Sequence, residues 1–388
     1  MITVTTPQPA TPHPATRPTL GLLRSLTDEH VLRLLLDHRQ LTRSELAALS
    51  GISKPTVAQS VQRLTEARLV RDTGERTTGR GRAGSYFALA EDLGQALAIA
   101  ITAAAVEVQR VDPRGEVRAH ARRPIPQSPT GGVERALLDA AAAATAGHER
   151  ARLAVVSAAD PVDRRTGRLV ELPDSPFVVG SLDPTGVLAT QVDGPVSVDN
   201  DVNWSARAEL AQPGAPSDFG LIYLGDGLGC SLVSDGDVRR GWHGLSGEIS
   251  HVVTIGPDHR ATTFTDVFAR LGLHRPGTHA IDSPRLAALM SDDTSPGARQ
   301  IRDTVVDAIC GVLVTIVSLA DPEVIIIGGP WGGLPNLIDI IADRMADQPR
   351  SVEVRLSRLP GDAPLAAARG QAVADLQRAL LASRACEA

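Results

Sequence analysis

The chain has 388 residues, about 2.6 times a domain of ~150 residues, so we expect two or three folded units and exclude a single small module. Hydrophobic residues make up 43% and charged residues 22%, a globular composition, and the formal net charge is −6. The charge is unevenly distributed: residues 1–90 carry 12 Lys and Arg against 7 Asp and Glu, a net of +5, which leaves −11 for residues 91–388. The sequence therefore predicts an acidic body with a basic N-terminal head.

The cysteines and the apolar segments bear on the cellular compartment. Cys230, Cys310 and Cys386 lie far apart without a CxxC pair, which argues against a disulfide framework or a thiolate zinc site and is typical of a reducing cytosol. Residues 1–19 are rich in Pro and Thr, lack the apolar core of a signal peptide, and predict a disordered arm. The longest apolar stretch, Val305–Ala320, contains an acidic residue and is shorter than the ~20 residues of a membrane span. We therefore expect a buried helix there, a cytoplasmic protein and no membrane partner.

Residues 20–90 predict a helical head. A first helix is expected from Thr27, whose hydroxyl suits a cap, and a second from Arg43 to Leu49. A turn at Gly51 follows, and Ser53 is expected to cap a third helix. A tight turn between the last two helices is typical of a helix-turn-helix.

The third helix has two contrasting faces. Val57, Val61 and Leu64 recur at i, i+4 and i+7 and are expected to face inward. The opposite face is expected to present polar and basic side chains: Lys54, Thr56, Gln59, Ser60 and Arg63. Short polar groups that read base edges, flanked by cations that hold phosphates, are what a recognition helix in the major groove requires.

The segment after the third helix predicts a β-hairpin wing. Two short apolar strands enclose a loop rich in Gly and Arg, from which Arg76, Arg80 and Arg82 are expected to reach the DNA backbone or the minor groove. The alternative is a helical dimerisation or docking module with a solvated basic face. Because the helices, the Gly turn, the polar face and the Arg wing agree independently, DNA binding by residues 20–90 is favoured.

Strand-like and helix-like runs alternate through residues 91–388 and predict an α/β body of two lobes. Lobe I is expected at about 95–202 plus 366–384, and lobe II at about 203–365.

Three motifs in this body carry a family resemblance. They are SVDNDVNWSARAEL at 197–210, IYLGDGLGCSLVSDGDVRRGWHGLSGEISH at 222–251 and DPEVIIIGG at 321–329. Together with the head, the chain from about residue 20 resembles the ROK family of repressors, open reading frames and sugar kinases. The resemblance implies a two-lobed, actin-like (ribonuclease-H-like) fold with a sugar in the cleft. Members with an N-terminal winged helix are typically sugar-responsive transcription factors, whereas members without it are typically ATP-dependent sugar kinases.

The resemblance also implies an effector pocket. Asp201 matches the family's catalytic aspartate, Glu248 and His251 match its sugar-binding pair, and Asn200 is expected to line the same pocket. The family's Pro-Gly-x-Val-Asp turn is replaced by Ala-Ala-Asp-Pro-Val-Asp at 158–163. Either the effector differs from common hexoses or ligand binding has decayed.

The phosphate side departs from the kinases of the family. The Asp-x-Gly-x-Thr loop of those kinases corresponds to residues 95–105 of this chain, which contain neither Asp nor Gly. At the position of their second phosphate loop, this chain has Asp226 between Gly225 and Gly227. An anion at that place repels phosphate, so we expect no bound ATP and no catalytic residue, unless the first loop is misaligned and its aspartate lies elsewhere. No cysteine follows His251 to complete the family's structural zinc site, so we expect neither a metal nor another cofactor.

These patterns predict a DNA-binding transcriptional regulator, more specifically a repressor, that responds to a sugar or sugar derivative. Its partners are expected to be a double-stranded DNA operator, the sugar effector and a second copy in a homodimer or dimer of dimers. One alternative is an active ATP-dependent sugar kinase with an appended DNA-binding head. Another is a constitutive DNA-binding protein with a vestigial body.

Overall fold

The computed structural model describes residues 20–77, 84–126, 132–173, 175–176, 182–292 and 294–382. The chain forms two compact units, Met1–Leu93 with Gln377–Ala388, and Gly94–Leu376. The expected boundary near residue 90 differs by a few residues. The expected assignment of all of 366–384 to lobe I was wrong, because the end of the last helix belongs to the head. The predicted arm at 1–19 lies outside the described residues.

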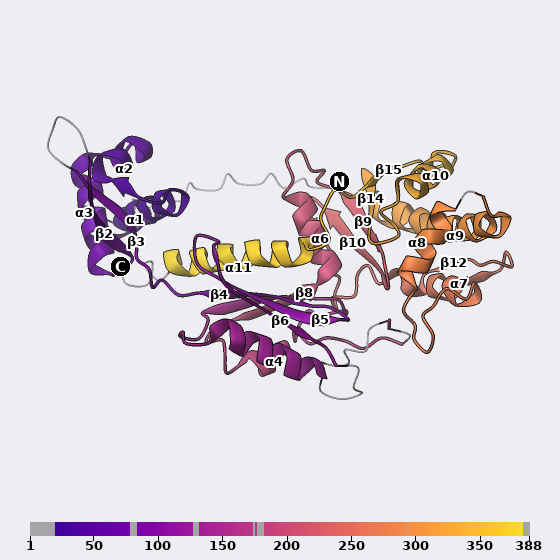
Figure 1. Ribbon diagram of the computed structural model, residues 1–388. Helices are drawn as coiled ribbons and strands as arrows, with labels where there is room; N and C mark the ends of the chain where they lie inside the picture. The colour runs from indigo at the N-terminus through magenta and orange to yellow at the C-terminus, as the bar shows by residue number, and fades with distance from the viewer. Residues whose placement is uncertain are drawn as a thin grey trace, which may run out of the picture. The chain divides into compact units, whose positions relative to one another are not determined.

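The head contains three helices and a small antiparallel sheet (Figure 1). The helices are α1 (Leu20–Asp37), α2 (Arg43–Ser50) and α3 (Lys54–Glu66), and the strands are β1 (Leu41–Thr42), β2 (Val70–Arg76) and β3 (Ser85–Leu89) in the order β1-β3-β2.

Local capping explains where α2 and α3 begin and end. Thr42 and Glu45 form a reciprocal capping box at the start of α2, and Gly51 ends that helix with a left-handed φ of 69°. The Ser53 side chain accepts the Thr56 N–H at the start of α3, as predicted. The prediction for α1 was wrong, because the helix begins at Leu20 and Thr27 lies inside it, where its hydroxyl donates to the Leu23 carbonyl.

One hydrophobic core holds the head together. Val57, Val61 and Leu64 of α3 are fully buried, as the spacing predicted, and pack with apolar residues of α1, α2 and the sheet. Leu380, near the end of α11 (Ala363–Ala382), belongs to the same core. The end of α11 is thus part of the N-terminal domain.

The first sheet of the body has the order β6-β5-β4-β7-β8. It comprises β4 (Ala96–Ile101), β5 (Ala105–Val111), β6 (Val117–Pro124), β7 (Leu153–Ala158) and β8 (Val196–Asn200). The strands β4, β5 and β6 are antiparallel, whereas β7 and β8 run parallel to β4. Side chains alternate along β4, so Leu97 and Ile99 pack against α4 (Gly132–Thr145), while Ala96 and Ala98 pack against α11.

The second sheet repeats this topology in the order β11-β10-β9-β14-β15. It comprises β9 (Phe219–Leu224), β10 (Leu228–Ser234), β11 (Asp237–Val238), β14 (Val324–Gly328) and β15 (Glu353–Leu356). α6 (Asp201–Leu210) packs on one face. The other face is covered by α7 (Phe264–Arg270), α8 (Ser283–Ser291), α9 (Pro296–Ala320) and α10 (Pro335–Ala346). The remaining elements are α5 (Pro184–Leu188), the 3-10 turn η1 (Ile249–His251) and the hairpin β12 (Val253–Ile255) and β13 (Ala261–Thr263).

The helix α9 is long and apolar enough to cross a membrane by length and composition alone. However, Val305, Ile309 and Leu313 are buried in the core of the second lobe. This position confirms the predicted buried helix, although it begins earlier, at Pro296.

Candidate functional site

The outer face of α3 is the candidate DNA-binding surface. Lys54, Thr56 and Gln59 are exposed there, as predicted. Lys54 is the only lysine in the chain. These three residues lie in the first two turns of α3, and the N-terminal residues of a recognition helix are those that contact base edges.

Two residues predicted for the same surface have a different role. Ser60 is fully buried and donates its hydroxyl to Asp28 of α1 at 2.5 Å, so its assignment to the outer face was wrong. Arg63 is half-buried and forms an ion pair with the same Asp28 at 2.6 Å. Ser60 lies on the apolar side of α3, where the buried Asp28 carboxylate requires hydrogen-bond donors. Ser60 and Arg63 thus join α3 to α1.

The wing consists of β2 and β3. Arg76 ends β2 and pairs with the exposed Asp72 at 3.1 Å. The predicted contacts of Arg80 and Arg82 lie outside the described residues.

In the body, polar side chains gather where parallel strands end. β7 ends at Ala158 and β8 at Asn200, and ligands of open α/β sheets bind beyond such carboxyl ends. Asn200 lines the cavity there, as predicted, but its oxygen caps α6 by accepting the Val202 N–H. Its amide donates to the backbone oxygens of Ala158 and Asp160 at 3.4 and 3.3 Å. Asn200 therefore positions the two strand ends relative to α6.

Asp201 is the first residue of α6 and lines the cavity. Burial raises the pKa of its carboxyl group to about 7. A buried network fixes the start of the helix behind it: Asn203 donates to Asp199 at 2.9 Å and accepts from Ser231 at 2.8 Å. Asp199 in turn pairs with Arg207 at 2.7 Å. A carboxyl group with a pKa near neutrality can accept a proton or hydrogen bonds from a hydroxyl.

Glu248 enters the cavity from the loop before η1. Burial, and then the charge of Asp201, raises the pKa of Glu248 to about 7. The preceding Gly247 has a φ of 97° and its carbonyl accepts the Cys230 N–H at 3.0 Å, which ties the loop to β10. A Cβ atom at Gly247 would overlap the Cys230 carbonyl oxygen, so the motif requires glycine there. His251 lines the same cavity and is exposed.

A third carboxyl group, Asp160, was not assigned to the site from the sequence. It occupies the turn after β7, is 3% exposed and lines the cavity. Burial raises the pKa of Asp160 to about 7, and the charges of Asp201 and Glu248 add to this effect. The available signal was a carboxylate at a place where the similar family has glycine.

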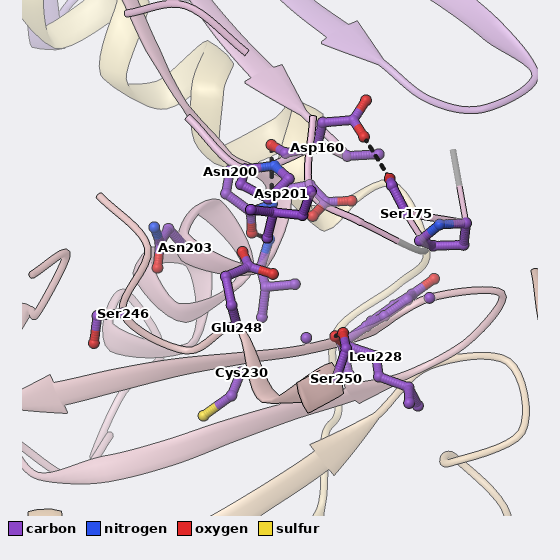
Figure 2. A pocket seen from close by; sticks show the side chains of 18 of the residues that line it. Asp160, Ser175, Asn200, Asp201, Asn203, Leu228, Cys230, Ser246, Glu248 and Ser250 are labelled. Atoms are coloured by element: carbon purple, nitrogen blue, oxygen red, sulfur yellow. Dashed lines mark hydrogen bonds between the residues drawn. The ribbon is translucent and has the colours of Figure 1, made fainter. Parts of the chain in front are cut away.

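The three carboxyl groups surround one pocket, shown in Figure 2. About 70 Å³ are open to the centres of water molecules. That is room for roughly five to seven waters, or about 150–200 Å³ of liquid, which matches one monosaccharide. Leu172, Pro173 and Leu228 add apolar surface, and no Lys or Arg lines the pocket among the described residues.

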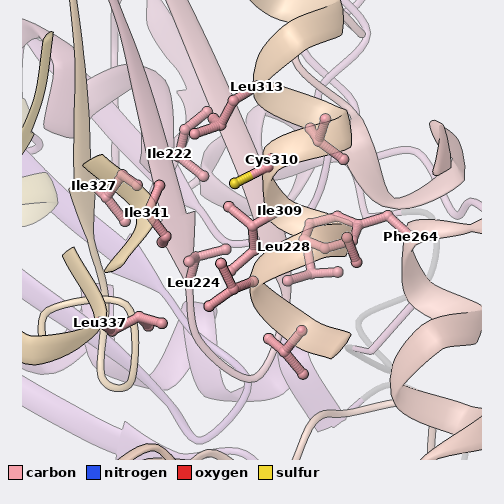
Figure 3. Packing of buried hydrophobic residues seen from close by; sticks show 14 of the residues in the cluster. Ile222, Leu224, Leu228, Phe264, Ile309, Cys310, Leu313, Ile327, Leu337 and Ile341 are labelled. Carbon is pink, nitrogen blue, oxygen red and sulfur yellow. The ribbon is translucent and has the colours of Figure 1, made fainter. Parts of the chain in front are cut away.

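Residues distant in the sequence hold the loop Gly225–Gly229 in place. Asp226 pairs with Arg275 at 2.8 Å and accepts the Ser283 hydroxyl at 2.6 Å, so a cation offsets the charge that was expected to repel phosphate. The Trp331 indole donates to the Gly225 carbonyl at 2.9 Å. Leu224, just before the loop, and Leu228, within it, lie in the hydrophobic core (Figure 3). The loop is therefore held by the second lobe.

Asp201 also lines a second cavity, of about 570 Å³. It is lined by Ala100 and Thr102, from the segment that corresponds to the first phosphate loop, and by Gly328 and Gly329. Its described lining has no Lys or Arg to offset phosphate charge. The described parts of the chain also hold no cluster of three or more His, Cys, Asp or Glu arranged for a metal ion.

Sequence comparisons match both parts of the chain. Residues 24–71 match the winged helix-turn-helix DNA-binding family, and residues 96–264 match the ROK family. The chain is 26% identical over 234 residues to the uncharacterized protein YphH of Escherichia coli K12, covering 59% of this chain and 58% of YphH. It is 32% identical over 161 residues to a glucokinase of Halalkalibacterium halodurans, covering 35% of this chain and 48% of the enzyme. The chain thus spans about half the length of these curated relatives.

Solved structures share the fold. A ROK family transcriptional regulator, a homologue of the E. coli MLC protein, superposes with a TM-score of 0.62 at 21% identity, covering 94% of this chain and all of that chain. A ROK glucokinase of Streptomyces griseus, solved with glucose and AMPPNP, superposes with a TM-score of 0.51 at 22% identity, covering 72% of this chain and 99% of that chain. Residues 96–264 thus match the ROK family behind a segment that matches winged helix-turn-helix domains, and the chain shares the fold of a solved ROK transcriptional regulator and of a ROK glucokinase.

Proposed function

We propose that this protein is a cytoplasmic, DNA-binding transcriptional repressor whose ROK domain binds a sugar or sugar derivative without phosphorylating it. The observation that carries the proposal is the pairing, in one chain, of an exposed polar face on a recognition helix with an acidic pocket of monosaccharide size.

The head supports the DNA-binding part of this proposal. Lys54, Thr56 and Gln59 combine a cation for phosphate with short polar groups for base edges. The match to winged helix-turn-helix domains covers the same helices. An operator read by such a domain commonly has two-fold symmetry, so we propose a homodimer or a dimer of dimers as the bound form.

The body supports a sensor that works without ATP, metal or other cofactor. Ala100 and Thr102 supply no carboxylate at the position of the first phosphate loop, although Glu107 and Asp362 line the same cavity, and Asp226 is already engaged by Arg275. Asp201 and Glu248 remain available to hold sugar hydroxyls. A ligand that binds one arrangement of the lobes better than another shifts the protein toward that arrangement by its differential affinity.

A DNA-binding assay tests the whole proposal. The full chain is titrated onto a fragment of its own promoter and onto a scrambled fragment, with and without hexoses, pentoses and amino sugars. We expect specific binding, and release by one sugar class. Equal affinity for both fragments would overturn the assignment of the head. If DNA binding is specific but no sugar alters it or shifts the melting temperature, the body is vestigial and the sensor part fails.

The competing function is an active sugar kinase with an appended head. The raised pKa of Asp201, to about 7, favours it, because a catalytic base works best near the ambient pH. A coupled assay with ATP and the same sugars separates the two functions. We expect no turnover above that of Asp201→Asn, and robust turnover abolished by this substitution would establish the kinase.

A further inference from the structure

The pocket contains a buried carboxylate with an unused oxygen. Asp160 is 3% exposed, and its Oδ1 accepts a single long hydrogen bond from the Ser175 hydroxyl at 3.3 Å. Its Oδ2 is buried and has no hydrogen-bond partner among the described residues. A buried acceptor without a partner is unfavourable, and native structures rarely leave one without a reason.

The backbone holds Asp160 at the pocket wall. The Ala159 N–H donates to the Ile101 carbonyl at 2.9 Å, and the Asn200 amide donates to the Asp160 carbonyl at 3.3 Å. Val170 donates to the Pro161 carbonyl at 2.8 Å on the other side. These contacts hold the backbone on both sides of Asp160 at the pocket wall.

The charges around Asp160 make it more unfavourable to leave its Oδ2 without a hydrogen bond. Asp201 and Glu248 line the same pocket, and Glu171 adds a further like charge near Asp160. His251 is the only basic side chain in the described lining, and Tyr223 contributes a phenol with a pKa raised to about 12 by burial. Apart from His251, the described lining supplies no cation to this group.

We propose that the effector is an amino sugar with a free, protonated amine that binds the Asp160 carboxylate. This inference rests on the proposed function of the pocket as a sugar sensor and specifies the ligand class. An ammonium group donates up to three hydrogen bonds and offsets negative charge, which a hydroxyl or an acetamido group does not. A metal ion fits less well, because the described residues hold no suitable ligand cluster. Asp201 and Glu248 remain for ring hydroxyls.

Calorimetric titration of the full chain tests this proposal without any variant. Glucosamine, galactosamine and mannosamine are each compared with their neutral parent hexose and their N-acetyl derivative. We expect one free amine to bind at least tenfold more tightly than both of its counterparts. If a neutral or N-acetylated sugar binds as tightly as its amine, the amine proposal is overturned while the sensor function stands. If no sugar binds, the sensor function itself fails.

Two variants then assign the amine to Asp160. Asp160→Asn keeps the shape and should weaken binding of the free amine at least tenfold while changing that of the parent hexose less than twofold. Asp163→Asn removes the same charge three residues along the turn, outside the pocket lining, and should leave the ratio unchanged. Equal loss for amine and hexose in a folded Asp160→Asn protein would make Asp160 a general acceptor and overturn the assignment.

Discussion

The head and the body each bury one conspicuous aspartate, and the two are satisfied very differently. Asp28 in the head is 5% exposed and receives the Ser60 hydroxyl at 2.5 Å and the Arg63 guanidinium at 2.6 Å. Asp160 in the body is 3% exposed and receives one hydroxyl at 3.3 Å. Burial is the same, but the partners differ. A fully paired buried carboxylate stabilises the fold, whereas a half-paired one identifies a place for a ligand.

The same contrast holds for the charge of the two regions. The cation of the candidate DNA surface, Lys54, is exposed and remains solvated until a phosphate approaches. Asp160, Asp201 and Glu248 of the pocket are shielded from water, and this burial raises the pKa of each carboxyl group to about 7. The head is therefore ready to bind at any neutral pH, while the pocket changes its charge in that range.

The largest expected effect comes from the loop that carries Glu248. In Gly247→Ala the new Cβ overlaps the Cys230 carbonyl oxygen, and we expect the body to lose about 4 kcal/mol of unfolding free energy. Gly236→Ala is the matched control, since its φ of 76° is similarly left-handed but no atom lies within 4 Å, and it should cost about 1 kcal/mol. All three tryptophans lie in the body, so denaturation followed by tryptophan fluorescence reports this unit. Equal losses in the two variants would show that the loop tolerates a side chain.

The second prediction concerns the pH dependence of the half-paired aspartate. The pKa of Asp160 is about 7 in the folded state and near 3.8 in the unfolded state. Between pH 3.8 and pH 7 the folded state therefore holds a proton that the unfolded state has lost. The contribution of Asp160 to the stability of the body should therefore be fully present below pH ~4 and be lost as the pH rises through 7. Asp160→Asn removes this loss and should be more stable than the natural protein at pH 8, on the order of 3 kcal/mol.

Asp163→Asn provides a control of opposite sign for that measurement. Backbone and hydroxyl hydrogen bonds from Thr166 lower the pKa of Asp163, so its contribution is present above the ordinary pKa and is lost on acidification. Its removal should weaken the protein at neutral pH and not at pH 3. If Asp160→Asn leaves the pH dependence of the unfolding free energy unchanged, the raised pKa of Asp160 is contradicted.

The third prediction addresses the fully paired aspartate. Arg63→Ala leaves the buried Asp28 with Ser60 alone and should destabilise the head by about 2 kcal/mol. Adding Asp28→Asn should restore most of that loss, since a neutral amide needs no cation. Arg33→Ala, which removes an exposed pair with Glu29, should cost less than about 0.5 kcal/mol. Hydrogen exchange of α1 and α3 peptides measures these differences, and a double variant as weak as Arg63→Ala would argue against the pairing.

The sequence predicted the architecture better than the roles of single side chains. Helical spacing located the buried face of α3, and the caps at Gly51 and Ser53 located the end of α2 and the start of α3, because these signals are local. Ser60 was misassigned because its partner, Asp28, lies more than thirty residues away and its burial depends on how α1 packs. Asp160 was missed because its significance arises only when two strand ends and a distant loop meet.

The partner of Asp226 was hidden for the same reason. The sequence places an anion in a glycine loop but does not reveal Arg275 and Ser283, about fifty residues further along, which neutralise and hold it. Long-range ion pairs leave no periodic signature, so the sequence could not show that the charge of Asp226 is offset.

The smallest expected effect concerns Lys54, the exposed cation of α3. Lys54→Ala removes one phosphate contact and should weaken binding to the promoter fragment by about 1 kcal/mol and reduce the slope of log affinity against log salt by about 1. Arg33→Ala deletes an equal charge from α1 and should change neither quantity.

Because Lys54 is the only lysine, amine-directed acylation of the chain modifies one side chain, which mass spectrometry distinguishes from the N-terminus. The promoter fragment should protect Lys54 from this reaction and scrambled DNA should protect it less, whereas equal reactivity with and without DNA would remove α3 from the interface and leave the basic head without its proposed partner.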